Sequence, residues 1–335
     1  MMRAGVIGLG IGEQHVRDYL AHESIDSVLV CDLNTARARD LANSMEGVKA
    51  VSSADALLDD SSIDIVSICS YDEFHHGQTI AALRNGKHVY VEKPLCQNVE
   101  QAADIRRELD RQSHLRLSSN LVLRTCPLFE SVREEVLDGM LGEIFSVDAD
   151  YLWGRTAKLT EGWRGKMESY SIIQGAAVHM IDLVIWITKA KPIEVMAWGN
   201  NLATAKQGVP FEDFVSLGLR FENGMIARVG AYGGCVHPHF HRLNVYGSKG
   251  TFKHDIQGTG WLNSSTRGEY QTPASRKYPG REWRGKALHS FLNAIRGLGE
   301  PLVETRDIFN VMTICFAAEK SLKQGLPVSI SYKEW

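Results

Sequence analysis

Short apolar runs alternate with segments of helical periodicity through the first third of the chain. The runs predict strands over Ala4–Ile7, Ser27–Cys31, Val48–Val51, Ile63–Cys69, Lys87–Val91 and Leu115–Ser119. The segments between them predict helices over Glu13–Ala21, Thr35–Asn43, His75–Asn85 and Val99–Gln112. Strands that alternate with helices build βαβ units, so the pattern predicts an α/β fold with a parallel sheet and helices on both faces.

After residue 120 the pattern changes to consecutive strands. They are predicted over Ile144–Trp153, Ile193–Trp198, Val215–Phe221, Met225–Tyr232 and Arg242–Tyr246. Glu222-Asn223-Gly224 is typical of a hairpin turn, which favours antiparallel pairing in a large second sheet. Helices are predicted over Leu128–Asp138, Ala176–Ile187, Ala287–Gly297 and Asp307–Gln324, and a long polar loop over Thr266–Arg284. We therefore expect two domains, residues 1–120 and residues 121–335.

Composition narrows the class of protein. The length of 335 residues fits two domains, and 37 basic against 40 acidic residues favour neither nucleic acid nor a membrane surface as a partner. No apolar run approaches the ~18 residues of a membrane span, and the N-terminus leads into a strand without signal-peptide features. The six cysteines include no Cys-x-x-Cys pair, which argues against a zinc ribbon or a disulfide scaffold. A cytoplasmic protein with reduced thiols is expected.

A glycine-rich turn follows the first predicted strand, at Gly8-Leu9-Gly10-Ile11-Gly12. Between a strand and a helix, such glycines let the backbone approach a pyrophosphate at the helix N-terminus. The third glycine comes one residue earlier than in Gly-x-Gly-x-x-Gly, and Glu13 stands in its place. A plain tight turn is the alternative.

Asp32 ends the second predicted strand, at the distance where a dinucleotide fold places an acidic residue on the adenosine ribose. A carboxylate there repels a 2′-phosphate, so NAD is favoured over NADP. Arg37 and Arg39 lie nearby and could weaken that preference. The alternative role for Asp32 is a helix N-cap.

The tripeptide Glu92-Lys93-Pro94 follows the strand predicted to end at Val91. Ligands of open α/β sheets bind at the carboxyl ends of the strands. An ammonium group there can point at a substrate oxygen, and proline stiffens the backbone behind it. The alternative is a surface lysine after a strand.

Together these features resemble the Gfo/Idh/MocA family of nicotinamide-dependent dehydrogenases over nearly the whole chain. The other matching motifs are Ser70-Tyr71-Asp72-Glu73-Phe74-His75, Gly86-Lys87-His88-Val89, His179-x-x-Asp182 and the segment from Pro301 to Ile330. The resemblance implies a Rossmann domain and a C-terminal α/β domain with a large, mostly antiparallel sheet. It also implies a homodimer or homotetramer formed through the open face of that sheet. Substrates of the family are sugars, sugar acids, inositols and nucleotide sugars.

The resemblance also implies a set of site residues. The catalytic residues would be Lys93, which polarises the reacting oxygen, and His179, which accepts the proton and meets Lys93 across the cleft between the domains. The cofactor-binding residues would be Gly8, Gly10, Ile11, Gly12, Asp32, Ser70, His75, Glu92 and Lys93. The substrate-binding residues would be Arg124, Trp163, Arg164 and Asp182. Many relatives carry an Asp four residues before the histidine, whereas this chain has Gly175 there, next to Gln174.

Several alternatives stay open. A single histidine in an apolar helix is often a hydrogen-bonded core residue, and this applies to His179. The run His237-Pro238-His239-Phe240-His241 superficially resembles a metal site, but no Cys or carboxylate lies at ligand spacing, so no metal is expected. Besides an NAD-dependent dehydrogenase acting on a carbohydrate, the fold would suit a non-catalytic cofactor-binding regulator or an NAD-dependent glycosidase.

Overall fold

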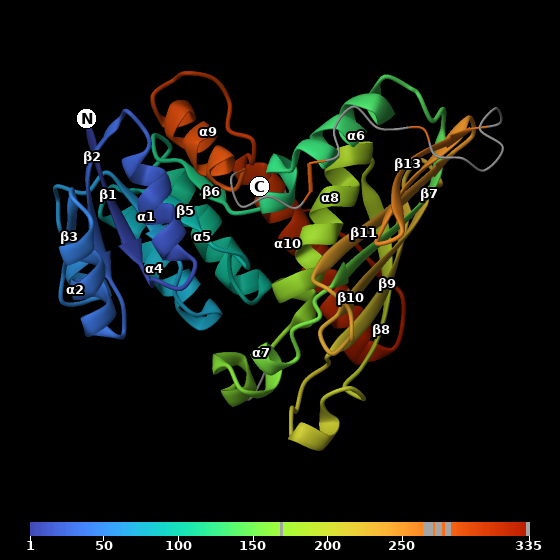
Figure 1. The fold of residues 1–335 in the computed structure, drawn as a ribbon, viewed down its shortest axis with the longest axis horizontal. Coiled ribbons are helices and arrows are strands. Elements are labelled where there is room, and N and C mark those ends of the chain that lie inside the picture. The colour runs from blue at the N-terminus through green and yellow to red at the C-terminus, as the bar shows by residue number, and fades with distance from the viewer. Residues whose placement is uncertain (168–169, 264–270, 272–276, 279–282, 333–335) are drawn as a thin grey trace. The chain divides into compact units, whose positions relative to one another are not determined.

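The computed structural model describes residues 1–167, 170–263, 271, 277–278 and 283–332 (Figure 1). The chain forms two units. The first comprises Met1–Val122 and the described part of Arg281–Phe309, and the second comprises the described parts of Leu123–Gly280 and Asn310–Glu334. Among the described residues, no helix has the length and apolar character needed to cross a membrane.

The first unit is built on a six-stranded parallel sheet in the order β3-β2-β1-β4-β5-β6. Its strands are β1 (Met2–Ile7), β2 (Ile25–Cys31), β3 (Val48–Ala50), β4 (Ile65–Ile68), β5 (His88–Val91) and β6 (Leu117–Ser119). Its helices include α1 (Gly12–Leu20), α2 (Thr35–Ser44), α3 (Ala54–Leu58), α4 (His75–Arg84) and α5 (Val99–Arg111). This order is that of a Rossmann fold, so the predicted fold of the first domain is confirmed.

One helix returns to this unit from far along the chain. Helix α9 (Gly285–Ile295) buries Leu288 and Phe291 in the core that also holds Val16 of α1 and Tyr90 of β5. The sequence pattern assigns all residues after 120 to the second domain. The amphipathic stripe of α9 predicts that the helix buries one face, but it does not specify which core the face joins.

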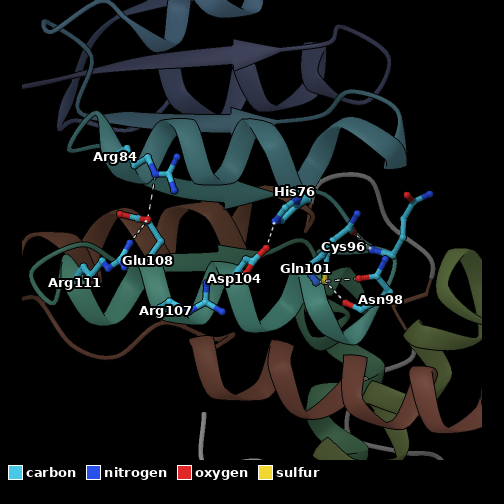
Figure 2. Close-up of polar contacts among 10 residues, drawn as sticks. His76, Arg84, Cys96, Asn98, Gln101, Asp104, Arg107, Glu108 and Arg111 are labelled. Carbon is cyan, nitrogen blue, oxygen red and sulfur yellow. Dashed lines mark hydrogen bonds and ion pairs between the residues drawn. The ribbon is translucent and has the colours of Figure 1, made fainter.

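Helices α4 and α5 are joined by ion pairs along their polar sides (Figure 2). Arg84 Nε and Arg111 Nη1 lie 3.2 and 3.5 Å from the same Glu108 carboxylate oxygen. His76 Nε2 lies 3.5 Å from Asp104 Oδ2. The charged groups in this view pair with one another, so we assign the α4–α5 pair a structural role.

The second unit is built on an eight-stranded sheet in the order β13-β12-β11-β7-β10-β9-β8-β14. The strands are β7 (Ile144–Leu152), β8 (Pro192–Asn200), β9 (Phe214–Phe221), β10 (Ile226–Tyr232), β11 (Phe240–Gly247), β12 (Gly250–Asp255), β13 (Gly258–Asn263) and β14 (Val328–Ser329). Among the described strands of this sheet, only β7 and β10 pair in parallel, so the expected mostly antiparallel sheet is confirmed.

Helix α8 (Val178–Thr188) packs against β7 and β10 and against α6 (Pro127–Leu137). Eight of its eleven residues are buried, as its largely apolar sequence predicts. A π-helical turn, Ile173–Ala177, directly precedes it. The remaining elements of the second half are α7 (Ala157–Thr160), α10 (Thr305–Gln324) and the 3₁₀ turns Val122–Thr125, Trp163–Lys166 and Ala205–Gln207. Most of the loop predicted over 266–284 lies outside the described residues.

The opposite face of this sheet carries a charged row. Tyr151 contacts the His179 ring on α8, so the preceding strand residue, Asp150, points the other way. Asp150 is fully buried beneath Arg228 and Arg242, whose guanidinium groups donate to its carboxylate. Strand pairing places Trp198 of β8 on the same face, and there it is exposed.

Candidate active site

The glycine-rich turn adopts the geometry expected of a phosphate-binding loop. Gly8 has a φ of +85°, and a Cβ there would lie 2.5 Å from the carbonyl oxygen of Cys69. A Cβ on Gly12 would lie 2.8 Å from Cγ1 of Val6. At Gly10, in contrast, an added Cβ would have no described atom within 4 Å beyond its own chain neighbours. Gly8 and Gly12 therefore permit close packing, while the backbone at Gly10 is open to an approaching ligand.

The N-terminus of α1 adds hydrogen-bond donors to this loop. The N-cap residue, Ile11, makes no side-chain capping bond, so the first backbone N–H groups of α1 have no side-chain acceptor from it. An uncapped helix N-terminus favours an anionic ligand through its N–H groups and its dipole. The residues present therefore fit a dinucleotide pyrophosphate.

Asp32 lies beside the loop at the end of β2. Its Oδ2 accepts a hydrogen bond from the Leu9 backbone N–H at 2.7 Å, and its Oδ1 accepts from the Asn34 N–H at 2.8 Å. Asn34 is the N-cap of α2, since its side chain accepts from the Arg37 N–H. The alternative reading of Asp32 as a helix N-cap is therefore wrong. The Asp32 carboxylate instead ties β2 to the glycine loop.

Glu13, the residue in place of the third glycine, pairs with the basic residues near the loop. Its carboxylate lies 2.9 Å from Arg17 Nη2 and 3.4 Å from Arg37 Nη2. The hydrogen bond from Arg17, together with Arg37, lowers the pKa of Glu13. The Arg37 guanidinium thus already has a carboxylate partner.

Lys93 follows β5 at the carboxyl edge of the Rossmann sheet, where it is half-buried. The Lys93–Pro94 peptide bond is cis. The preceding residue, Glu92, is buried, and its Oε1 accepts from Asn120 Nδ2 at 2.6 Å. Asn120 in turn accepts from the Tyr90 hydroxyl at 3.3 Å. Lys93 is thus adjacent to a buried carboxylate that is held by hydrogen bonds.

His15 is the second partner of this carboxylate, and the sequence pattern gave it no role. Its Nε2 lies 3.4 Å from Glu92 Oε1, and its ring is buried on α1. His15 follows Gly12 by three residues, which places both on one face of the helix, toward the sheet. The helical spacing could have indicated a buried histidine, but not that its partner would be Glu92, the residue that follows β5.

Ser70 and His75 lie next to this strand end. The Ser70 hydroxyl donates to Gln78 Oε1 at 2.7 Å. The two ring nitrogens of His75 lie 2.6 Å from the Pro94 carbonyl oxygen and 3.1 Å from the Ser70 carbonyl oxygen. His75 therefore connects the backbone after β4 to the turn that carries Lys93. The structure brings Ser70, His75 and Lys93 to one sheet edge, as the sequence predicts.

In the second unit, His179 is buried on α8 and stacks on Tyr151 of β7, with ring centroids 5.8 Å apart and planes at 13°. Tyr151 also contacts the rings of His239 and His241, at 5.2 and 4.7 Å. The Tyr278 hydroxyl lies 2.7 Å from His241 Nδ1. Within the described ranges, no group of three or more His, Cys, Asp or Glu residues is placed to hold a metal ion.

Arg124 and Asp182 are bound to each other. Arg124 Nε lies 3.2 and 3.0 Å from the two carboxylate oxygens of Asp182, and Nη2 lies 2.6 Å from Oδ1. The two side chains are 4% and 1% exposed. The sequence suggests that both bind substrate, but each has its charge matched by the other. We assign the pair the role of fixing α8, and with it His179, to the 3₁₀ turn that holds Arg124.

Trp163 and Arg164 form part of an aromatic cluster. The Arg164 guanidinium carbon lies 4.1 Å from the Trp163 ring centroid, 5.5 Å from that of Trp153 and 5.2 Å from that of Tyr170. Such distances are those of cation–π contacts. The structure therefore brings together the aromatic and guanidinium groups that the sequence groups as a substrate-binding segment.

The Gly175 position is filled by a neighbouring side chain. A Cβ on Gly175 would collide with the Tyr170 hydroxyl, so an Asp could not replace this glycine without moving Tyr170. The adjacent Gln174 donates to Glu319 at 2.8 Å. Both residues lie in the π-helical turn before α8, a feature that often marks functional sites.

Comparison with known proteins places these elements in a family. Residues 2–120 match the model of an oxidoreductase family with an NAD-binding Rossmann fold, and residues 129–253 match the Gfo/Idh/MocA C-terminal domain. The chain belongs to the Gfo/Idh/MocA oxidoreductases. The family predicted from the sequence motifs is thereby confirmed, and the first unit is the NAD-binding domain of such an enzyme.

Among Gfo/Idh/MocA proteins, the chain is 28% identical over 295 residues to a 1,5-anhydro-D-fructose reductase of Ensifer adhaerens, covering 83% of this chain and 84% of that protein. It is 25% identical to a myo-inositol 2-dehydrogenase of Thermotoga maritima, covering 98% of each. A crystal structure of scyllo-inositol dehydrogenase from Lactobacillus casei, with bound NAD(H) and scyllo-inositol, shares the fold. Its TM-score is 0.81 at 20% identity, with 99% of this chain and 100% of that chain covered.

Proposed function

We propose that this oxidoreductase transfers hydride between nicotinamide and a CH–OH group of a carbohydrate: a sugar, an inositol or a nucleotide sugar. The observation that carries the proposal is the position of Lys93, two residues after the end of β5, at the carboxyl edge of a Rossmann sheet whose first loop fits a pyrophosphate. The names of the relatives, a sugar reductase and inositol dehydrogenases, support the substrate class. In this scheme residues up to about 120 bind the cofactor and the later residues bind the substrate.

The reaction needs little from the protein beyond orientation and proton transfer. Bound NAD would supply the hydride acceptor, or NADH the donor. The Lys93 ammonium would donate a hydrogen bond to the oxygen that alternates between hydroxyl and carbonyl. His179 would accept the hydroxyl proton, or return it in the reverse direction. Ser70, His75 and Glu92 would shape the cofactor side of the site, and Trp163 with Arg164 would contact the substrate.

NAD is the proposed cofactor rather than NADP. The Asp32 carboxylate lies at the end of β2, where it would accept from the ribose hydroxyls and repel a 2′-phosphate. The nearby Arg37 pairs with Glu13, which reduces its capacity to bind that phosphate. The local charges therefore favour an unphosphorylated ribose.

A homo-oligomer formed through the second sheet is also proposed. The face of this sheet that lies away from α8 carries Trp198 and Ile226, which are 56% and 49% exposed. Exposed apolar residues on one sheet face, around the paired charges of Asp150, are typical of a surface that packs on a second copy.

Turnover assays would test the proposed function. The purified protein is incubated with NAD and a panel of sugars, inositols and nucleotide sugars, and NADH is followed by its absorbance. Lys93→Met should lower turnover by about 10²–10⁴-fold, because general acid–base groups commonly contribute that much, while NADH binding changes little. Lys49→Met, at an exposed lysine on β3, is the matched control.

Each outcome bears on a named role. Near-normal turnover by Lys93→Met would reject Lys93 as the polarising group. Near-normal turnover by His179→Ala alone would leave Lys93 as the principal acid–base group. Product formation without net reduction of NAD would favour a transient oxidation, as in an NAD-dependent glycosidase, over a dehydrogenase.

A further inference from the structure

We propose that His15 is a positioning residue for Lys93, acting as a cation that holds the buried carboxylate of Glu92 in place. The catalytic meaning of this pairing rests on the function proposed above for Lys93. The contacts among His15, Glu92 and Lys93 lie within the first unit and do not depend on that function.

The geometry connects α1 to the end of β5. His15 is 3% exposed, and its Nε2 lies 3.4 Å from Glu92 Oε1. Its other ring nitrogen, Nδ1, lies 3.1 Å from the Ser67 hydroxyl, which in turn lies 2.9 Å from the Tyr19 hydroxyl. Contacts at both nitrogens fix the plane of the ring, so that Nε2 faces Glu92.

The pair of His15 and Glu92 also has an electrostatic role, because Glu92 is a buried carboxylate. A buried carboxylate is costly unless an opposite charge and hydrogen bonds compensate it. Burial works against ionisation of Glu92, but His15, Lys93 and Asn120 outweigh it and lower its pKa. Glu92 is thus ionised at neutral pH and needs a positive partner inside the unit as well as Lys93 beside it.

The same contacts favour the protonated form of His15. Burial disfavours its imidazolium, but its neighbours Cys69 and Glu92 raise the pKa of His15 overall. Burial raises the pKa of the Cys69 thiol, so that this group is neutral near pH 7. Glu92 is therefore the anion in contact with the ring, at 3.4 Å from Nε2, and its charge favours the imidazolium. A small pocket beside the ring is lined by His15, Gln14 and Asn120, among others. The other titratable or charged groups around the ring and this pocket are Asp18, Tyr19, Tyr90 and Arg284.

The result is an alternating row of charges, positive at His15, negative at Glu92 and positive at Lys93. Removing the charge of His15 and removing the charge of Glu92 should change how tightly Lys93 holds its proton, in opposite directions. Without Glu92, the Lys93 ammonium loses an attractive neighbour and loses its proton more readily. Without the charge on His15, the Glu92 carboxylate acts on Lys93 unopposed, and Lys93 holds its proton more tightly.

A chemical-modification experiment separates these directions without any substrate. The intact protein is treated briefly with acetic anhydride at pH 8, and acetylation of Lys93 is measured by mass spectrometry relative to exposed Lys49. Because only the free amine reacts, His15→Gln should slow Lys93 acetylation by about threefold or more, and Glu92→Gln should accelerate it by a similar factor. The double variant should return close to the original rate.

The controls exclude a general structural effect. His22 is also buried next to α1, but it contacts the neutral groups of Ser24 and Asn293, so His22→Gln should leave Lys93 reactivity unchanged. An unchanged circular dichroism spectrum and a cooperative thermal unfolding transition would show that each variant is folded. Equal reactivity in all variants, or a shift in the same direction for His15→Gln and Glu92→Gln, would overturn the proposal.

Turnover supplies a second readout once a substrate is identified. His15→Gln should lower kcat by about tenfold with little change in KM, because an ammonium that is misplaced costs mainly transition-state stabilisation. Unchanged kcat would overturn the positioning role. If instead Lys93→Met is fully active while the acetylation pattern appears as expected, the charge row stands and the catalytic role of Lys93 fails.

Discussion

The buried pair of Arg124 and Asp182 offers a quantitative test of how the second unit holds α8. Asp182→Asn would leave the Arg124 guanidinium, which is 4% exposed, without its carboxylate. Three nitrogen–oxygen contacts of 3.2 Å or less would lose their charge. Breaking a buried pair by removing one partner typically costs about 3–5 kcal/mol. For a unit of this size, that corresponds to a fall in Tm of roughly 10 °C.

Urea and thermal unfolding, followed by circular dichroism, would measure this loss. The matched control is the exposed pair of Arg220 and Glu194, with contacts of 3.1 and 3.0 Å, for which Glu194→Gln should cost about 0–1 kcal/mol. The double variant Arg124→Met with Asp182→Leu should recover most of the stability, since no buried charge remains unpaired.

A loss below about 1 kcal/mol for Asp182→Asn would refute the structural assignment of the pair. If the same variant raised KM while leaving stability intact, the two side chains would return to the substrate-binding role that the sequence suggested. The two outcomes are therefore distinguished by one variant.

Three further perturbations test the cofactor, the core and the assembly. Asp32→Ala should narrow the difference between the dissociation constants of NADH and NADPH, and tighter NADPH binding by the unaltered protein would contradict the choice of NAD. Burial lowers the pKa of His254 from 6.5 to about 4. Between these two pH values the unfolded state binds more protons than the folded state, so the free energy of unfolding should fall by about 3 kcal/mol as the pH drops from 6.5 to 4. His254→Phe should flatten that part of the stability curve in urea titrations, and an unchanged slope would show that another group titrates. Trp198→Glu should weaken self-association measured by light scattering, whereas Leu298→Glu, at a similarly exposed position of the first unit, should not. Particles of only 37.3 kDa from the unaltered protein at micromolar concentration would rule self-association out.

The Rossmann sheet could be predicted because its strands are buried on both faces. Such strands appear in a sequence as nearly continuous apolar runs, as in Ile65–Ile68 and His88–Val91. Strand β12, in contrast, contains Lys253, His254 and Asp255 and was not predicted. Its pairing with β11 and β13 overrides a sequence that has little strand character.

A site residue could be predicted where its position relative to one strand was enough to locate it. Lys93 follows an apolar run, so its position at the sheet edge could be deduced. The partners of charged residues could not, because they come from distant segments. Asp182 lies 58 residues from Arg124, and nothing in the helical pattern of α8 specifies that pairing. For the same reason His15 and Glu92 appear unrelated in the sequence.

The return of α9 to the first unit has a consequence for how the protein is made. The core around Tyr90 and Val16 is complete only when Leu288 and Phe291 arrive. After Val122 the ribosome must add roughly 160 residues before α9 begins, which takes about 10–30 s at 5–20 residues per second. During that interval the nascent nucleotide-binding unit exposes apolar surface, and Leu123–Gly280, which contributes most of the second unit, emerges before α9. Substitutions on the buried face of α9 should therefore reduce the yield of folded protein in cells, and a fragment cut at residue 122 should need α9 supplied separately to become soluble.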